Sequence, residues 1–265
     1  MPEHFWTAIA LTTGAGLATT VGSLLALVIK RPGARFLGFA LGFSAGVMIH
    51  VSFVELLQGA VDGFSSALGG DATHAGFALA HLAFFAGMGS YFLIDLLVPH
   101  EFGAHHDHPA GGEPDPLMRT GLLVALGIGI HNFPEGMATF AGTLADPSLG
   151  LAIAVAIAVH NIPEGVAVSV PIYAATGSRG RAFFWSFLSG VTEPIGALVA
   201  GFLLLPIIQN PFVMAGVLAA VGGIMVAISL DELIPSARSY GSEHAPIIGA
   251  IIGMVVMALS LGLLK

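Results

Sequence analysis

The sequence contains no cysteine and very little charge. Of its 265 residues, Asp, Glu, Lys and Arg make up 9%, against roughly 25% in a typical soluble domain, whereas hydrophobic residues make up 55%. Without cysteine there are no disulfides and no thiolate metal sites, so any metal must bind through nitrogen, oxygen or thioether groups. The net charge of −8 gives no case for a nucleic-acid partner. The composition is that of a membrane protein, with the lipid bilayer as its surroundings.

Long apolar stretches run through the whole chain. A bilayer core of about 30 Å needs about 20 mostly apolar residues per helix, and the sequence predicts eight such spans. They cover approximately residues 6–29, 36–58, 76–98, 118–143, 148–174, 182–207, 212–234 and 245–264. No positive charge precedes the first apolar run, which favours a retained span over a cleaved signal peptide. We expect an all-α integral membrane protein in which residues 1–265 form a single polytopic domain.

The basic residues lie in alternate loops. Seven of the eight fall between spans 1 and 2, 3 and 4, 5 and 6, and 7 and 8: Lys30, Arg31, Arg35, Arg119, Arg179, Arg181 and Arg238. Lys and Arg near the ends of spans are retained on the cytoplasmic side. We therefore expect a multi-pass protein of the cell inner membrane with both termini outside the cytoplasm and the loop 99–117 inside.

Two nearly identical hexapeptides interrupt adjacent spans. They are HNFPEG at residues 131–136 and HNIPEG at residues 160–165. On a helix, positions i and i+4 share a face, so His131 with Glu135, and His160 with Glu164, would each present an imidazole and a carboxylate to one point. Because adjacent spans run in opposite directions, the two copies form an inverted repeat near mid-membrane, an arrangement found at transporter substrate sites.

Each motif also contains a proline, an asparagine and a glycine. Proline removes a backbone donor and frees the carbonyl four residues earlier, which hydrocarbon tolerates only where protein buries it or where it lines a cavity. Asn132 and Asn161 lie about 100° around the helix from the histidines and could face a second point. A further carboxylate, Glu193, precedes a proline in span 6. These nitrogen and oxygen ligands suit Zn²⁺, Fe²⁺, Mn²⁺ or Co²⁺.

The residues of the motifs disfavour two other interpretations. Polar side chains could only join helices by hydrogen bonds, but a charged residue at mid-bilayer costs about 2.5–3.5 kcal/mol, which disfavours several of them for packing alone. A membrane metalloprotease would need His-Glu-x-x-His, a pattern absent from this sequence. The tandem motif therefore predicts a metal-binding centre within the membrane.

These residues resemble the ZIP family of divalent metal-ion transporters, most closely its bacterial members. The resemblance rests on GFSAGVMIHVSFVELL in span 2, the two hexapeptides, Glu193 with the preceding ATGSRGRAFFWSFLSG, and GIMVAISLDELIP in span 7. It implies eight helices in a 3+2+3 inverted repeat, both termini outside the cytoplasm, metal uptake into the cytoplasm and, in many members, a homodimer. It also implies a binuclear site. One metal would be held by His131, Glu135, His160 and Glu164, and the other by Asn132, Glu135, Asn161, Glu164 and Glu193.

Residues along a pathway are suggested more weakly. Met48 matches a thioether-ligand position of the family but could equally be core packing, and Glu55 matches an entrance position. Asp95, Asp231 and Glu232 could form an exit path or simply be solvated at the membrane surface. His105, His106 and His108 lie in the loop 99–117, whose composition fits either loose metal binding or a solvated linker.

The sequence as a whole predicts a secondary transporter and not an enzyme. Its cargo would be zinc first, with iron, manganese, cobalt and cadmium as further substrates, and no cofactor is expected. There is no Walker motif, so ATP is not the direct energy source. The alternatives that remain are a selective divalent-metal channel and a membrane metalloenzyme or metal sensor.

Overall fold

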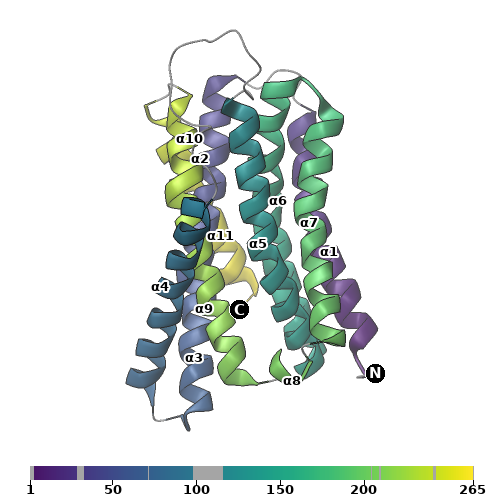
Figure 1. Ribbon diagram of the computed structural model, residues 1–265, viewed down its shortest axis with the longest axis vertical. Helices are drawn as coiled ribbons and strands as arrows, with labels where there is room; N and C mark the ends of the chain where they lie inside the picture. Colours follow the sequence, from purple (N-terminus) through teal and green to yellow (C-terminus); the bar gives the residue numbers. More distant parts are fainter. Residues whose placement is uncertain are drawn as a thin grey trace.

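Every regular element in the described part of the chain is a helix (Figure 1). The computed structural model describes residues 3–28, 33–70, 72–97, 116–203, 205–208, 210–240 and 243–264. The all-α fold is confirmed. The helices are α1 (Phe5–Leu27), α2 (Ala34–Val51), η1 (Ser52–Leu56), α3 (Leu57–Ala67), α4 (Thr73–Leu97), α5 (Pro116–Ala145), α6 (Pro147–Thr176), α7 (Arg179–Phe202), α8 (Leu205–Ile208), α9 (Pro211–Ile228), η3 (Ser229–Leu233), α10 (Ile234–Ser239) and α11 (Ala245–Leu264).

Seven helical stretches in the described ranges are long and apolar enough to cross a membrane. They are Phe5–Leu24, Ala34–Ala67, Thr73–Leu93, Ile153–Thr176, Arg179–Phe202, Pro211–Ser239 and Ala245–Gly262. The expected span 118–143 corresponds to α5, which is not among the seven although it contains 30 residues. The count of eight spans is therefore not confirmed, because it requires α5 to cross the membrane as well.

The sequence explains several helix boundaries. α6 begins where the Asp146 side chain accepts a hydrogen bond from the Ser148 amide, with Pro147 at the first helical position. It ends at Thr176, and the next residue, Gly177, has a φ of 62°. α7 ends at Phe202, not at residue 207 as expected. Pro206 has no amide hydrogen to donate to the Phe202 carbonyl, so the helix cannot continue unchanged. The four residues of α8 follow as a separate turn.

Two helical rods each contain a π-helical turn at a matching place. α2 passes through η1 into α3, and α9 passes through η3 into α10. Both turns begin at a serine whose hydroxyl donates to a methionine carbonyl four residues earlier: Ser52 to Met48 at 2.6 Å and Ser229 to Met225 at 2.8 Å. The sequences around them share the spacing Met-x₃-Ser-x₂-Glu-Leu. This second internal repeat was not recognised from the sequence.

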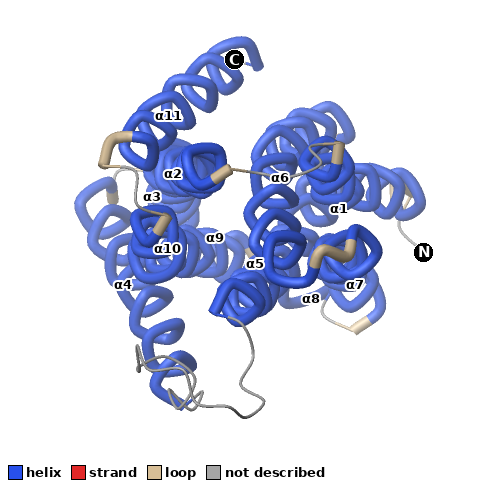
Figure 2. Tube along the Cα trace, turned by 90° about the horizontal axis from the view of Figure 1, so that it is seen from above, coloured by secondary structure: helices blue, strands red, loops and turns tan. Residues whose placement is uncertain are grey.

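The helices gather into two groups (Figure 2). In one, α1, α5, α6 and α7 pack against one another; in the other, α2 packs on α11, and α3, α4 and α9 pack together. A cluster of buried apolar side chains, including Leu41, Ile128, Ile172 and Ile228, joins the two groups. Between them, the Ser44 hydroxyl of α2 also donates to the Pro163 carbonyl of α6 at 2.6 Å.

The polarity of the bundle is reversed relative to a soluble protein. Large apolar side chains such as Leu82, Phe85 and Leu259 project outward and are more than 60% exposed. Buried positions in the interior include imidazoles, carboxylates and carboxamides. A water-soluble monomer does not present so much apolar surface, whereas a bundle surrounded by lipid does.

Candidate metal centre

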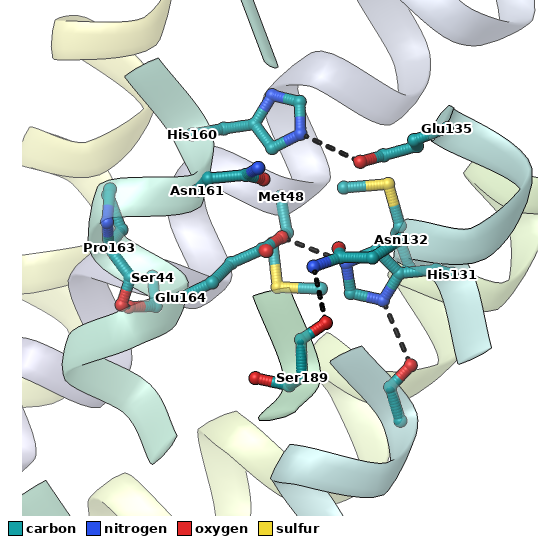
Figure 3. A network of polar contacts seen from close by, with 12 residues as sticks. Ser44, Met48, His131, Asn132, Glu135, His160, Asn161, Pro163, Glu164 and Ser189 are labelled. Carbon is teal, nitrogen blue, oxygen red and sulfur yellow. Dashed lines mark hydrogen bonds and ion pairs between the residues drawn. The ribbon is translucent and has the colours of Figure 1, made fainter. Parts of the chain in front are cut away.

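The two hexapeptides face each other across α5 and α6, which pack side by side. Both helices continue unbroken through their internal prolines, Pro134 and Pro163. His131, Asn132, Glu135, His160, Asn161, Glu164 and Glu193 are all 0–1% exposed. The structure therefore brings together, in one buried cluster, all seven residues that the sequence predicts as ligands. Figure 3 shows those that α5 and α6 contribute.

Each imidazole pairs with the glutamate of the opposite motif. His131 Nε2 lies 2.9 Å from Glu164 Oε1, and His160 Nε2 lies 3.3 Å from Glu135 Oε2. The expected convergence of each histidine with the glutamate of its own motif is thus replaced by two crossed pairs. In this arrangement no three His, Asp or Glu side chains of the described ranges converge as a ready metal-binding group.

The antiparallel direction of α5 and α6 explains the crossing. Histidine and glutamate are one helical turn, about 6 Å, apart within each motif. Since the two helices run in opposite directions, the histidine of one lies level with the glutamate of the other. The two pairs therefore stand one above the other, related by an approximate two-fold axis between the helices.

The asparagines and Glu193 extend the cluster toward α1 and α7. Asn132 Nδ2 donates to the Ser189 carbonyl of α7 at 3.2 Å. Asn161 Nδ2 donates both to the Ala15 carbonyl of α1 at 2.9 Å and to Glu193 Oε2 at 2.8 Å. Both amide nitrogens are used in this way, and the amide oxygens, which have no hydrogen-bond partner, remain as potential ligands.

A backbone carbonyl orients the first histidine. His131 Nδ1 lies 3.1 Å from the Gly127 carbonyl oxygen, one turn earlier in α5. A carbonyl can only accept a hydrogen bond, so Nδ1 carries the proton and Nε2 is the nitrogen presented to the cluster. Such second contacts commonly fix the tautomer and direction of a metal-ligating imidazole.

Several buried acceptor atoms at the cluster have no hydrogen-bond partner. They are Asn132 Oδ1, Glu135 Oε1, Asn161 Oδ1, Glu164 Oε2 and Glu193 Oε1. An unpaired buried polar atom costs roughly 1–3 kcal/mol, and folded proteins leave few of them. The cluster therefore contains five oxygen acceptors without a partner and two imidazoles, and a bound cation would supply the missing partner.

The glycine after each motif glutamate permits close helix packing. A Cβ built on Gly136 would overlap the Glu193 carbonyl of α7, and one built on Gly165 would overlap the Thr19 carbonyl of α1. The two contacts hold Glu193 and the α1 backbone against the cluster. Glycine therefore contributes to the centre by the absence of a side chain.

The residues that the sequence suggested for a pathway lie in different elements and differ in burial. Met48 is fully buried in the core cluster and appears in Figure 3 among the residues of the two motifs. Glu55 and Glu232 are half-buried in η1 and η3, and Asp231 is exposed. Asp95 belongs to α4, but its side chain lies outside the described part. His105, His106 and His108 lie outside the described residues altogether.

Sequence reasoning missed the groups that support the cluster. The Gly127, Ser189 and Ala15 carbonyls act through the backbone, which their residue types do not reveal. Ser44, which joins α2 to Pro163, is an ordinary small residue in an apolar helix. The Met-x₃-Ser-x₂-Glu-Leu repeat is the one signal that could have been read from the sequence, since it relates span 2 to span 7 in the same way that the hexapeptides relate spans 4 and 5.

An apolar bundle with histidines, carboxylates and carboxamides buried at its centre defines a multi-pass membrane protein with an interior suited to cations. Comparison with known proteins identifies the family. The model of the family described as ZIP Zinc transporter matches residues 99–261, and the chain belongs to this family.

Relatives are similar over nearly the full length of the chain. A protein named zinc transporter ZupT from Streptococcus mutans is 51% identical over 264 residues, covering 98% of each chain. Proteins of the same name from Oceanobacillus iheyensis and Chlorobium phaeovibrioides are 52% and 53% identical, each covering 99% of both chains. The family predicted from the motifs is thus confirmed.

Proposed function

We propose that the protein is a secondary transporter that takes up divalent metal ions, zinc first, across the inner membrane into the cytoplasm. Its relatives are named zinc transporters. The observation that carries the proposal is the buried cluster of two histidine–glutamate pairs and unpartnered carboxylate and amide oxygens. The same ligand types accept Fe²⁺, Mn²⁺, Co²⁺ and Cd²⁺, so these ions are further candidate substrates.

The proposed cargo site is binuclear. His131, Glu135, His160 and Glu164 would bind one ion, and the two glutamates would also serve a second ion together with the remaining ligands. Those remaining ligands are Asn132, Asn161 and Glu193. The unpartnered second oxygens of Glu135 and Glu164 support a bridging role, since each glutamate uses its other oxygen for a histidine.

The proposed architecture is one polytopic domain of eight spans in a 3+2+3 inverted repeat, with α5 as the eighth span. The repeat in α2–η1 and α9–η3 supports it, because this inversion relates span 2 to span 7. Both termini would lie outside the cytoplasm.

This orientation also places the proposed pathway residues. Glu55 would lie on the outer side of the centre. Asp231 and Glu232 would lie on its inner side, together with Asp95 at the end of α4.

Uptake into proteoliposomes tests the proposal. Vesicles containing a zinc-sensitive dye would receive the wild type, Glu164→Gln, or the control Glu243→Gln, whose position is an exposed carboxylate near the start of α11. Glu164→Gln removes one charge and the partner of His131, so zinc uptake should fall at least tenfold while the control stays active. Unchanged uptake in Glu164→Gln would refute the assigned centre.

The same vesicles distinguish the alternatives. A carrier saturates with rising zinc and supports counterflow, whereas a channel conducts in proportion to concentration and shows no counterflow. A metalloenzyme or sensor would bind zinc with no flux at all. We expect saturation and counterflow.

A further inference from the structure

An apolar groove runs along the outside of the bundle between α5 and α7. It has a volume of about 710 Å³, within the range of small-molecule sites. Leu122, Leu126 and Phe133 line it from α5, and Trp185, Leu188 and Thr192 line it from α7. It lies at the back of the metal centre, because Asn132 and the Ser189 carbonyl join the same two helices.

The groove offers a ligand almost nothing but hydrocarbon contact. None of its lining residues is charged. The two hydroxyls at its wall are engaged within α7, where Ser189 donates to the Ser186 carbonyl at 2.9 Å and Thr192 donates to the Ser189 carbonyl at 2.6 Å. Leu126 and Leu188 are 51% and 43% exposed, so the groove opens toward the surroundings of the bundle.

The dimensions of the groove match one leaflet of a bilayer. Along α5 it extends from Leu122 to Pro134, and twelve residues at 1.5 Å each give about 18 Å. Half of a hydrocarbon core of ~30 Å is about 15 Å. A single acyl chain could therefore lie in the groove along its length.

Positive charge stands at one end of the groove. Arg181 lies one turn before Trp185 in α7, and Arg179 begins the same helix; both side chains are exposed. The Arg179 guanidinium carbon is 6.0 Å from the centre of the Tyr173 ring, close to the end of α6. Tryptophan next to basic residues is typical of the membrane–water interface, where phosphate groups are found.

We propose that the groove between α5 and α7 binds a phospholipid with an anionic headgroup, one acyl chain lying in the groove and the phosphate lying at Arg179 and Arg181. The lipid would belong to the membrane leaflet on the side of the two arginines. In the orientation proposed above this is the cytoplasmic leaflet, but the lipid site itself does not depend on that orientation. A second copy of the chain fits less well. A two-fold axis along the membrane normal would bring two such arginine pairs to the same level beside each other.

Tryptophan fluorescence provides a direct test. The chain has two tryptophans, Trp6 and Trp185, so Trp6→Phe leaves only the one in the groove. The variant, in lipid-depleted detergent micelles, is titrated with phosphatidylglycerol or phosphatidylcholine carrying brominated chains, which quench nearby tryptophan. Trp185 should be quenched at about tenfold lower concentration by phosphatidylglycerol, from the attraction of two arginines. Trp6, observed in Trp185→Phe and 64% exposed, should show no headgroup preference.

Two pairs of variants locate the site. Gly129 lines the groove, and a Cβ there would make only ordinary contact with Thr192 at 3.4 Å, so Gly129→Leu is the variant chosen to fill the groove. It should abolish the saturable quenching of Trp185, while Gly89→Leu, at an open exposed position on α4, should not. Arg179→Gln with Arg181→Gln should remove the preference for phosphatidylglycerol. The matched change, Arg35→Gln with Arg238→Gln, should keep it.

Other outcomes would overturn the proposal. Equal quenching of Trp185 by both lipids in the Trp6→Phe protein, with both arginines in place, would show that the arginines bind no headgroup. Quenching unaffected by Gly129→Leu would place the lipid elsewhere. If Gly129→Leu instead converts a dimer into a monomer in size-exclusion chromatography with light scattering, the groove is an interface between two copies of the chain. None of these measurements depends on metal transport.

Discussion

At the level of single residues, helix spacing at the centre depends on the glycine that follows each motif glutamate. Gly165→Ala would drive a methyl group into the Thr19 carbonyl of α1. Overpacking of this kind costs about 1–3 kcal/mol, so we expect a lower melting temperature in detergent and weaker zinc binding. Gly14→Ala is the matched control, because a Cβ there meets nothing within 4 Å. Equal melting temperatures for the two variants would contradict the packing argument.

The proton balance of the centre is a second property of single residues. Each histidine shares a hydrogen bond with a glutamate at 2.9 or 3.3 Å, and a metal that uses both atoms must displace the shared proton. Zinc affinity should therefore fall as the pH falls. Calorimetry in buffers of different ionisation enthalpy should count up to two protons released as the first zinc ion binds between the two pairs. A count of zero would mean that the pairs stay intact and that the metal binds elsewhere.

The identities of the central residues could be predicted from the sequence, but their partners could not. The repeated motif and the proline after Glu193 single out all seven residues, because such groups are too costly within apolar helices to be accidental. Which histidine meets which glutamate depends on how far one helix is shifted along the other, a quantity absent from either motif. The Gly127 and Ala15 carbonyls were not predictable, because every residue has one.

At the level of helices, the contact between α2 and α6 joins the two groups of the bundle. The Ser44 hydroxyl donates to the Pro163 carbonyl, beside Glu164 in the second motif. A buried hydrogen bond of this kind contributes about 0.5–1.5 kcal/mol. If one group moves against the other during transport, the bond holds the described arrangement and must break for the movement.

Ser44→Ala should therefore lower the melting temperature slightly and raise the maximal rate of zinc uptake. Ser260→Ala is a suitable control, since Ser260 donates only to the Val256 carbonyl within α11. Uptake rates in proteoliposomes and thermal unfolding of both variants provide the measurement. A maximal rate that falls in Ser44→Ala would mean that the bond supports the active arrangement instead of restraining it.

The positions of the helices could be predicted from hydropathy, whereas the π-helical turns within them could not. The apolar runs predicted where helices lie, but the extension of span 2 to Ala67 and of span 7 to Ser239 arises because each π-helical turn continues directly into a further helix. Hydropathy is insensitive to one extra residue in a turn. The shortened α7 could have been predicted from Pro206.

At the level of the whole molecule, the proposed orientation can be tested because the chain has no cysteine of its own. α3 ends on the same side of the bundle as the N-terminus, and α10 lies on the opposite side (Figure 1). Ser66 and Ser239 are exposed at the ends of these helices. In intact cells, a membrane-impermeant maleimide should label Ser66→Cys, whereas Ser239→Cys should react only after permeabilisation. The reverse pattern would invert the orientation and with it the direction of transport.

The crossed pairs have a consequence for the charge inside the membrane. Two shared protons carry the same total charge as one divalent cation, so exchanging them for the first of the two proposed ions leaves the charge of the buried centre unchanged. Moving a net charge into hydrocarbon is costly, whereas a centre of constant charge meets the same electrostatic barrier with either occupant. The pairing of His131 with Glu164 and of His160 with Glu135 thereby makes an electroneutral exchange possible, in which the membrane voltage would have little influence on the rate.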